Sequence, residues 1–259
     1  MAVSVSGASP PMVTGSYGMA ATQPFDAPAG ALLVAGYAGS GGDIPVASGI
    51  TWTLRKESVN KRAKLWTAPV PTAKPGLQVT LTGSNPIGGF KVWLVTGHEP
   101  GTYVGRSGAN TSTTNNATVT GYAATRLGSL GFCVANEHNT TGSATARPSS
   151  TDVAEGYTMA EIFSGAGNGL FVRKAAAAAA AEQAVTFNLD APGTAAANWE
   201  WAALEILGPA DAEPPSTPPN LRVVEVTGTS LTVGWDPSTD NLGVSGYGVW
   251  LDGAKVAGP

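Results

Sequence analysis

The chain has 259 residues, a formal net charge of −4 and only 12% charged residues. Its 34 glycines and 19 prolines favour a turn-rich, all-β protein over a helical one. Lys and Arg do not gather as they do in nucleic-acid-binding proteins, and no apolar run reaches the roughly 20 residues of a membrane helix. We therefore expect neither a nucleic-acid partner nor membrane insertion.

Residues 1–24 are expected to form an N-terminal arm and a first strand. The beginning, Met1–Pro11, has neither the basic region nor the apolar region of a signal peptide. We therefore expect the protein to reach the outside of a cell by release within a particle, or to have lost a signal by trimming.

Short apolar or alternating runs bounded by Gly, Pro, Asn or Thr recur from residue 25 to residue 208 and are typical of strands. Apolar and polar residues alternate most regularly in Leu77–Thr82 and Val185–Asp190. Without a long amphipathic helix, the pattern predicts an all-β fold, with a jelly-roll-like two-sheet β-sandwich over residues 25–208. The expected strands are Ala31–Tyr37, Ile50–Lys56, Ala63–Thr67, Leu77–Thr82, Phe90–Thr96, Leu130–Ala135, Leu170–Lys174, Ala184–Leu189 and Trp199–Leu207.

Four stretches depart from a simple strand pattern. The apolar residues of Trp199–Leu207 do not hold one parity, which predicts a bulge or a strand that crosses from core to rim. The seven alanines Ala175–Ala181 are too few for a stable helix and predict a turn or loop. The polar stretches Ser107–Thr118 and Asn139–Ser150 predict long loops, where binding residues are commonly found.

Candidate catalytic groups are few. Cys133 lies among apolar and small residues, which predicts a buried, inert thiol rather than a nucleophile. Glu200 and Glu205 could form a pair of glycosidase carboxylates, but they fall on opposite parities of one strand. We interpret them as a solvated rim carboxylate and an edge residue.

The chain carries no metal-binding motif, and no cofactor is expected. A structural calcium ion is the alternative, with oxygen ligands from acidic side chains of the first domain or from the Glu137–Asn139 segment. The spacing of these acidic residues does not follow a calcium-loop pattern. They are Asp26, Asp43, Asp152 and Asp190.

The strongest concentration of charge is a basic cluster, with five Lys or Arg residues among ten positions. These residues are Arg55, Lys56, Lys61, Arg62 and Lys64. The pattern predicts the solvated tip of a hairpin loop. The alternative is a contact surface for an acidic protein neighbour or an anionic cell-wall polymer.

Aromatic residues offer a second kind of contact surface, because an aromatic face can stack on a sugar ring. The tryptophans of the first domain lie within expected strands and are interpreted as core residues. They are Trp52, Trp66, Trp93, Trp199 and Trp201. Tyr103 follows Gly101 in a loop and is the better candidate for an exposed contact.

Residues 209–220 are rich in proline and predict an extended linker. After it, Leu231, Val233 and Trp235 alternate on one strand, Asp236–Gly246 forms a loop, and Tyr247 begins another strand. Residues 221–259 thereby resemble the N-terminal half of a fibronectin type III module, as found in secreted bacterial polysaccharide hydrolases and actinobacteriophage tail proteins. Half a sandwich leaves an apolar face open, so we expect further residues beyond Pro259 or a neighbouring chain to complete it.

The first domain resembles the Gly/Thr/Ala-rich sandwich domains of actinobacteriophage minor tail proteins and other virion surface proteins. The stretches that carry this resemblance are Pro28–Tyr37, Ile50–Thr53, Ala63–Ala68, Lys91–Gly97 and Asn198–Leu207. It implies a non-enzymatic virion structural protein, located on the particle surface and acting in assembly and host-surface contact. It also implies other virion proteins as partners, a homo-oligomer with a trimer favoured, and a host cell-surface glycan as a further partner.

Three alternatives remain open. A carbohydrate-binding accessory module of a secreted bacterial polysaccharide hydrolase would share both the sandwich and the fibronectin-like segment. A capsid decoration protein would keep the virion but change the location. A depolymerase of cell-wall glycans would need Glu200 or Glu205 as an acid or a base.

Overall fold

A computed structural model describes residues 3–18, 21–84, 86–138, 152–158, 167–190, 197–211, 213–240, 244 and 246–258. In these ranges the chain forms strands, turns and loops without a helix, and the strands pair in antiparallel fashion. The chain divides into two compact units, Met1–Pro209 and Ala210–Pro259. The predicted all-β sandwich is confirmed.

The first half of unit 1 forms a 6-stranded sheet, which we call the first sheet. Its order is β1-β10-β4-β7-β6, and β2 also pairs with β10. The strands are β1 (Ser4–Val5), β2 (Val13–Gly15), β4 (Leu32–Ser40), β6 (Thr53–Glu57), β7 (Ala63–Pro69) and β10 (Ile87–Thr96). Strand β4 reads as a nearly continuous apolar and glycine run because both of its faces are covered.

The second half of unit 1 forms a 5-stranded sheet, the second sheet, in the order β11-β17-β13-β15-β14. Its strands are β11 (Val104–Ser112), β13 (Leu130–Glu137), β14 (Asp152–Thr158), β15 (Asn168–Lys174) and β17 (Trp199–Ile206). Every residue of β13 and β17 is buried. Both faces of this sheet must therefore be covered by other parts of the chain.

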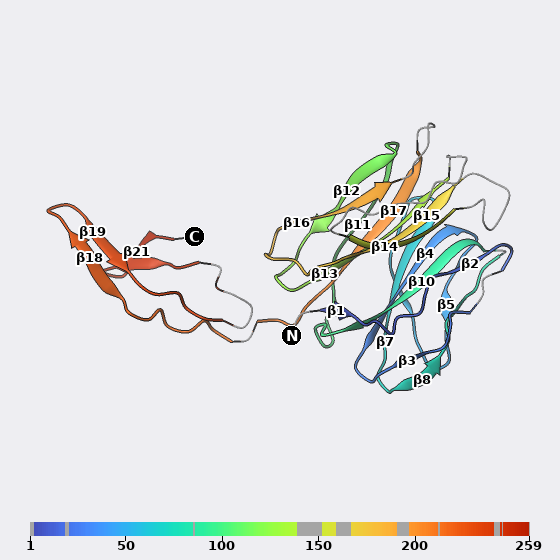
Figure 1. Cartoon of the computed structure of the whole chain (residues 1–259), viewed down its shortest axis with the longest axis horizontal. Helices are drawn as coiled ribbons and strands as arrows, with labels where there is room; N and C mark the ends of the chain where they lie inside the picture. The colour runs from blue at the N-terminus through green and yellow to red at the C-terminus, as the bar shows by residue number, and fades with distance from the viewer. Residues whose placement is uncertain are drawn as a thin grey trace. The chain divides into compact units, whose positions relative to one another are not determined.

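The two large sheets face each other, and shorter strand pairs cover their outer faces (Figure 1). Pairs β3–β8 and β5–β9 cover the first sheet, and the pair β12–β16 covers the second. These strands are β3 (Phe25–Ala27), β5 (Pro45–Val46), β8 (Lys74–Leu77), β9 (Thr80–Leu81), β12 (Asn116–Ala123) and β16 (Ala184–Asp190). Unit 1 thus has further layers outside the two sheets that the sequence predicted.

The two halves share one strand connectivity. The first sheet has the order β1-β10-β4-β7-β6, and the second sheet has the order β11-β17-β13-β15-β14. The strands correspond in this order, so that β10 is equivalent to β17 and β4 is equivalent to β13. The outer pair β3–β8 corresponds to β12–β16. The strand registers match as well: Leu32 lies opposite Val95 in one sheet and Leu130 opposite Ile206 in the other, and all four face the central core.

This correspondence extends to a row of residues at one end of each sheet. In the first sheet the row is Gly89, Ala38, Ala63 and Ser58. In the second sheet the row is Glu200, Asn136, Gly169 and Tyr157. Ser58 and Tyr157 therefore occupy equivalent positions, as do Gly89 and Glu200.

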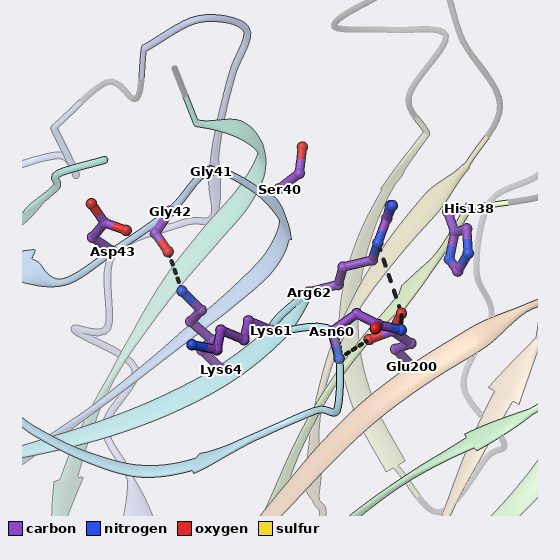
Figure 2. Close-up of a pocket in the computed structure, with 10 residues that line it drawn as sticks. All are labelled: Ser40, Gly41, Gly42, Asp43, Asn60, Lys61, Arg62, Lys64, His138 and Glu200. Atoms are coloured by element: carbon purple, nitrogen blue, oxygen red, sulfur yellow. Dashed lines mark hydrogen bonds and ion pairs between the residues drawn. The ribbon is translucent and has the colours of Figure 1, made fainter. Parts of the chain in front are cut away.

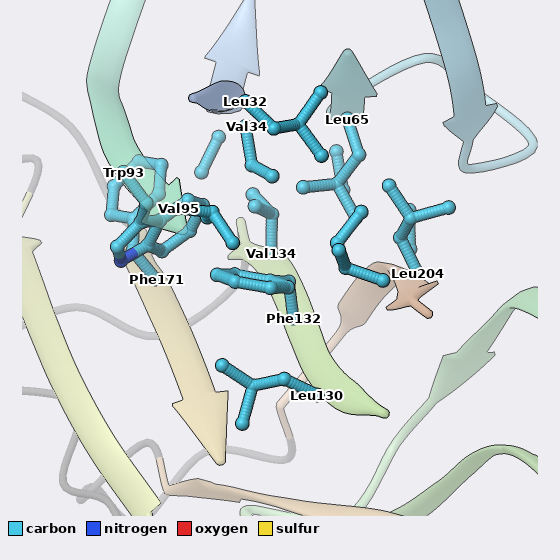
Figure 3. Close-up of a cluster of buried hydrophobic side chains, with 14 of the residues drawn as sticks. Leu32, Val34, Leu65, Trp93, Val95, Leu130, Phe132, Val134, Phe171 and Leu204 are labelled. Carbon is cyan, nitrogen blue, oxygen red and sulfur yellow. The ribbon is translucent and has the colours of Figure 1, made fainter. Parts of the chain in front are cut away.

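The central core between the two large sheets is dense and apolar (Figure 3). Trp93 packs edge-on against Phe132, with ring centroids 5.2 Å apart. Gly36 leaves room for Val134, because a Cβ atom on Gly36 would lie 2.5 Å from Val134 Cγ2. Each fully buried large apolar side chain contributes about 1.5–3 kcal/mol, so this core holds the two halves together.

Several sequence predictions need correction. The stretch Ser107–Thr118 is not a loop but most of β11 and part of β12; β11 is an edge strand, which tolerates polar side chains. Leu77–Thr82 alternates in burial as predicted, yet it is split between β8 and β9. Strand β17 pairs with β13 in regular register, and its pairing with β11 has a register shift between Val104 and Ser107 of β11. The mixed parity of β17 reflects the burial of both of its faces.

Two other predictions on irregular stretches have different outcomes. Ala175–Ala181 forms bends and a turn rather than a helix, as predicted. The predicted loop Asn139–Ser150 lies outside the described residues.

Unit 2 consists of two hairpins, formed by β18 (Arg222–Val226) with β19 (Leu231–Gly234) and by β20 (Val249–Leu251) with β21 (Ala254–Ala257). The rings of Trp235 and Tyr247 pack with centroids 5.3 Å apart. Most apolar side chains of these hairpins are exposed, including 61% of Val224 and 63% of Trp250. The strands occupy the stretches that resemble the first half of a fibronectin type III module.

We predict that Gly36→Val destabilises unit 1 by about 1–3 kcal/mol, because the added side chain would overlap Val134, Trp93 and Phe171 in the central core. Urea unfolding followed by tryptophan fluorescence measures the change. Gly7→Ala is the matched control, since a Cβ there meets nothing within 4 Å. Equal stability of Gly36→Val and the native protein would contradict the close packing of the two halves.

Candidate functional site

A polar pocket of about 470 Å³ opens at one end of unit 1, where the two halves meet (Figure 2). The first half contributes the segment after β4 and the turn between β6 and β7, and the second half contributes the ends of β13 and β17. The lining residues are Ser40, Gly41, Gly42, Asp43, Asn60, Lys61, Arg62, Lys64, His138 and Glu200. No Phe, Tyr or Trp side chain lies among them.

The turn between β6 and β7 supplies two basic side chains of the pocket, Lys61 and Arg62. Ser58 closes the turn: its backbone N–H bonds Ala63 O at 2.9 Å, and its Oγ accepts hydrogen bonds from the backbone N–H groups of Arg62 and Ala63. Lys61 takes a left-handed backbone conformation with φ of 61°. The turn therefore places Lys61 and Arg62 on the side of the pocket.

Only part of the predicted basic cluster reaches the pocket. Lys61, Arg62 and Lys64 line it, whereas Arg55 and Lys56 do not. Lys64 is not part of a solvated tip, because it lies on β7 and is only 8% exposed, with its Nζ donating to Gly42 O. The prediction of a solvated loop is therefore wrong for Lys64.

Tyr103 is partly buried and contacts Arg55. The Arg55 guanidinium donates to Tyr103 Oη at 3.2 Å and lies 5.5 Å from the centre of the ring, while its Nε donates to Thr67 Oγ1 at 2.7 Å. The two side chains thus form an intramolecular cation–π contact next to the first sheet. Their role as a surface for a partner stays a prediction.

Glu200 is buried inside the molecule, and the prediction of a solvated rim carboxylate is wrong. Its side chain is 1% exposed and accepts hydrogen bonds from Ser58 Oγ at 2.9 Å and from Asn60 Nδ2 at 2.8 Å. The Arg62 Nε lies 3.8 Å from Glu200 Oε1. Glu200 therefore ties the turn of the first half to the second half.

Glu205 is also fully buried, so the prediction of an edge residue is wrong. It accepts hydrogen bonds from the backbone N–H groups of Arg106 at 2.8 Å and Thr125 at 2.7 Å. It shares the outer face of β17 with Trp201, whereas Glu200 shares the inner face with Leu204. The two carboxylates lie on opposite faces of the sheet and do not face a common substrate position.

His138 lies at the second-half side of the pocket (Figure 2). Asn198 Nδ2 lies 3.0 Å from His138 Nε2, within hydrogen-bond distance. Nδ1 is buried and has no hydrogen-bond partner within the part of the chain that the structure describes. Burial and the Arg62 charge lower the pKa of His138, which keeps this ring neutral.

The other candidate groups are the tryptophans of unit 1, Cys133 and the side chains considered for a metal site. All five tryptophans of unit 1 are buried, as predicted, and so is Cys133, whose pKa is raised by burial. Within the described ranges, no three His, Cys, Asp or Glu side chains gather as a metal ion would require. No described helix has the length and apolar character to cross a membrane.

The contribution of Ser40–Asp43 to the pocket was not predicted from the sequence. The glycine-rich run Gly39–Gly42 directly after an apolar strand was a signal for an exposed turn. Nothing in the sequence pattern joined this turn to His138 or Glu200, because these residues come from the other half.

Comparison with known proteins gives only partial matches. A stretch of 49 residues, 19% of this chain, is 49% identical to Chitinase A1 of Niallia circulans, of which it covers 7%. A stretch of 46 residues is 46% identical to Chitinase Chi52 of Paenibacillus xylanexedens, covering 18% of this chain and 9% of that protein. A stretch of 56 residues is 41% identical to Exochitinase 1 of Streptomyces olivaceoviridis, covering 21% of this chain and 9% of that protein.

The chain thus spans less than a tenth of the length of these chitinases. No protein-family model matches the chain, and no solved structure matches it significantly.

We predict that Glu200→Gln lowers the free energy of unfolding by about 1–3 kcal/mol, because the amide replaces a buried carboxylate that accepts hydrogen bonds from Ser58 and Asn60. Urea unfolding measures the loss. Glu182→Gln is the control, since Glu182 forms an exposed ion pair with Arg106 and should change stability little. A Glu200→Gln variant as stable as the control would contradict the structural role of Glu200.

We predict that stability falls as the pH is lowered below the usual histidine pKa of 6.5, because the pKa of His138 is lower in the folded chain than in the unfolded chain. Glu200 and Glu137 oppose this shift, and burial also lowers the pKa of His98. His138→Gln should reduce the loss of stability between pH 7 and pH 5, measured by urea unfolding at each pH. His98→Gln separates the second contribution, and an unchanged pH dependence in His138→Gln would refute the prediction.

Proposed function

We propose that the protein is a non-enzymatic structural component of a phage virion that acts in assembly and host-surface contact. The proposal follows the resemblance of the first domain to minor tail and other virion surface proteins. In this function unit 1 is a rigid platform, and the pocket between its halves is the contact site. Several copies arranged by symmetry, as a trimer or another homo-oligomer, would combine weak single contacts into tighter overall binding.

The observation that carries the non-enzymatic part of the proposal is the fixed position of the two carboxylates. Glu200 and Glu205 lie on opposite faces of β17, and each accepts hydrogen bonds from neighbouring loops. A glycosidase needs two carboxyl groups on either side of one bond, at a separation of about 5–9.5 Å. Two carboxyl groups on opposite faces of one strand do not flank a common glycosidic bond, which supports a non-enzymatic role.

The basic rim of the pocket supports contact with an acidic surface. Lys61 is exposed, the Arg62 side chain is 37% exposed, and both come from a turn at the end of the sandwich. Long-range attraction by such a rim raises the rate of encounter with an anionic polymer.

A second candidate is a carbohydrate-binding accessory module of a secreted polysaccharide hydrolase. The matches to three chitinases are the reason to consider it, and their lengths of 46 to 56 residues are close to that of unit 2. We assign these matches to unit 2, whose sequence resembles a fibronectin type III segment of such enzymes. A spacer of this kind occurs in both candidates, so it does not choose between them.

Labelling of the protein in purified particles tests the proposal and separates a tail position from a capsid decoration. We expect the label on the particle surface and no release of reducing sugars from cell-wall glycans by the purified protein. Sugar release that Glu200→Gln or Glu205→Gln abolishes would establish an enzyme instead. A protein secreted alone, absent from particles and bound to polysaccharide, would establish the accessory module.

A further inference from the structure

The pocket contains a buried cation, Lys64, that forms no ion pair with a carboxylate of the described residues. Lys64 is 8% exposed, and its Nζ donates to the carbonyl oxygen of Gly42. No carboxylate of the described residues lies within 4.0 Å of this ammonium group. A buried charge without a counter-ion is costly, and the ammonium has further N–H groups to donate.

Other donors of the same pocket lack strong partners. Arg62 has a long contact of 3.8 Å with Glu200 as its ion pair, and His138 Nδ1 is buried without a hydrogen-bond partner among the described residues. Figure 2 shows Lys61 and Lys64 extending toward the segment of Gly42 and Asp43, with Arg62 and His138 at the other side. The pocket thus presents N–H donors from two sides.

The pocket also offers acceptors and space for more than a simple ion. Asp43 is exposed at the rim, and Asp43 and Glu200 bring negative charge that disfavours a dianion such as phosphate. Carboxylate and amide groups such as those of Asp43 and Asn60 can bond the hydroxyl groups of a sugar. The volume of about 470 Å³ is within the usual range for a small-molecule site.

We infer that this pocket binds the carboxylate-bearing sugar residue of an anionic glycan. The sugar carboxylate would lie at Lys64 and Lys61, where it supplies the missing counter-ion, and sugar hydroxyls would bond Asp43, Asn60 and the Nδ1 of His138. The inference deepens the proposed host-surface contact and rests on it for the choice of a glycan.

Titration of the complete chain with D-galacturonate, followed by NMR chemical shifts, tests the inference. D-galactose is the neutral counterpart, and inorganic phosphate tests for a general anion site. We expect saturable binding of galacturonate with shifts at Lys61 and Arg62, at least tenfold weaker binding of galactose, and weaker binding of phosphate. Galacturonate should also raise the melting temperature of the protein.

Lys64→Met removes the ammonium and keeps an apolar chain of similar length, and we expect it to weaken galacturonate binding at least tenfold. Lys56→Met is the matched control, because Lys56 belongs to the same basic cluster but does not line the pocket. If Lys64→Met does not fold, Lys61→Met at the exposed rim replaces it, with an expected loss of at least threefold.

Four outcomes would overturn the inference: no saturable binding, equal affinity for galactose, phosphate binding as tight as galacturonate, or an equal loss in Lys56→Met. Failure of galacturonate with the protein still located on particles overturns the inference and leaves the virion proposal standing. Saturable, Lys64-dependent binding by a protein absent from particles overturns the virion proposal alone.

Discussion

Burial of both faces of the two large sheets is the constraint on which the rest of the structure depends. Strands β13 and β17 are buried at every position, so a carboxylate on them loses water and needs hydrogen-bond donors within the protein. Glu200 bonds the β6–β7 turn, and Glu205 bonds the backbone near Arg106 and Thr125. The second sheet thereby ties the β6–β7 turn, which lines the pocket, to its buried strand β17.

The sequence was most informative where burial is uniform. Runs such as Leu130–Ala135 were predicted as strands because a short apolar run bounded by Gly or Asn is typical of a buried strand. The edge strand β11 was missed, since its exposed positions carry the Ser, Thr and Asn residues that also mark loops. The next strand along the chain, Asn116–Ala123, does alternate in burial, so the pattern of β12 contained a usable signal.

The site was only half visible in the sequence. The basic cluster predicted Lys61 and Arg62 as contact residues, because charge density is a local property. Glu200 was wrongly predicted to be solvent-exposed, because its position on the strand was interpreted for a sheet with one face in contact with solvent. Its hydrogen-bond partner Ser58 lies 142 positions away in the other half, so the sequence pattern did not indicate burial. Pairing between two halves of equal connectivity depends on tertiary packing, which no local pattern encodes.

The equal connectivity allows the two junctions to be compared within the described residues. At the equivalent junction, Tyr157 takes the position of Ser58 and Gly89 that of Glu200. The Tyr157 ring fills the space over Gly89, and its hydroxyl donates to Ala38 O at 2.7 Å. In the described part of the chain, an aromatic ring thus covers one junction, while the other uses a buried carboxylate and keeps Lys64 beside an open polar space. A buried ammonium without an ion pair to a described carboxylate costs stability, which favours a ligand as the reason for the charge.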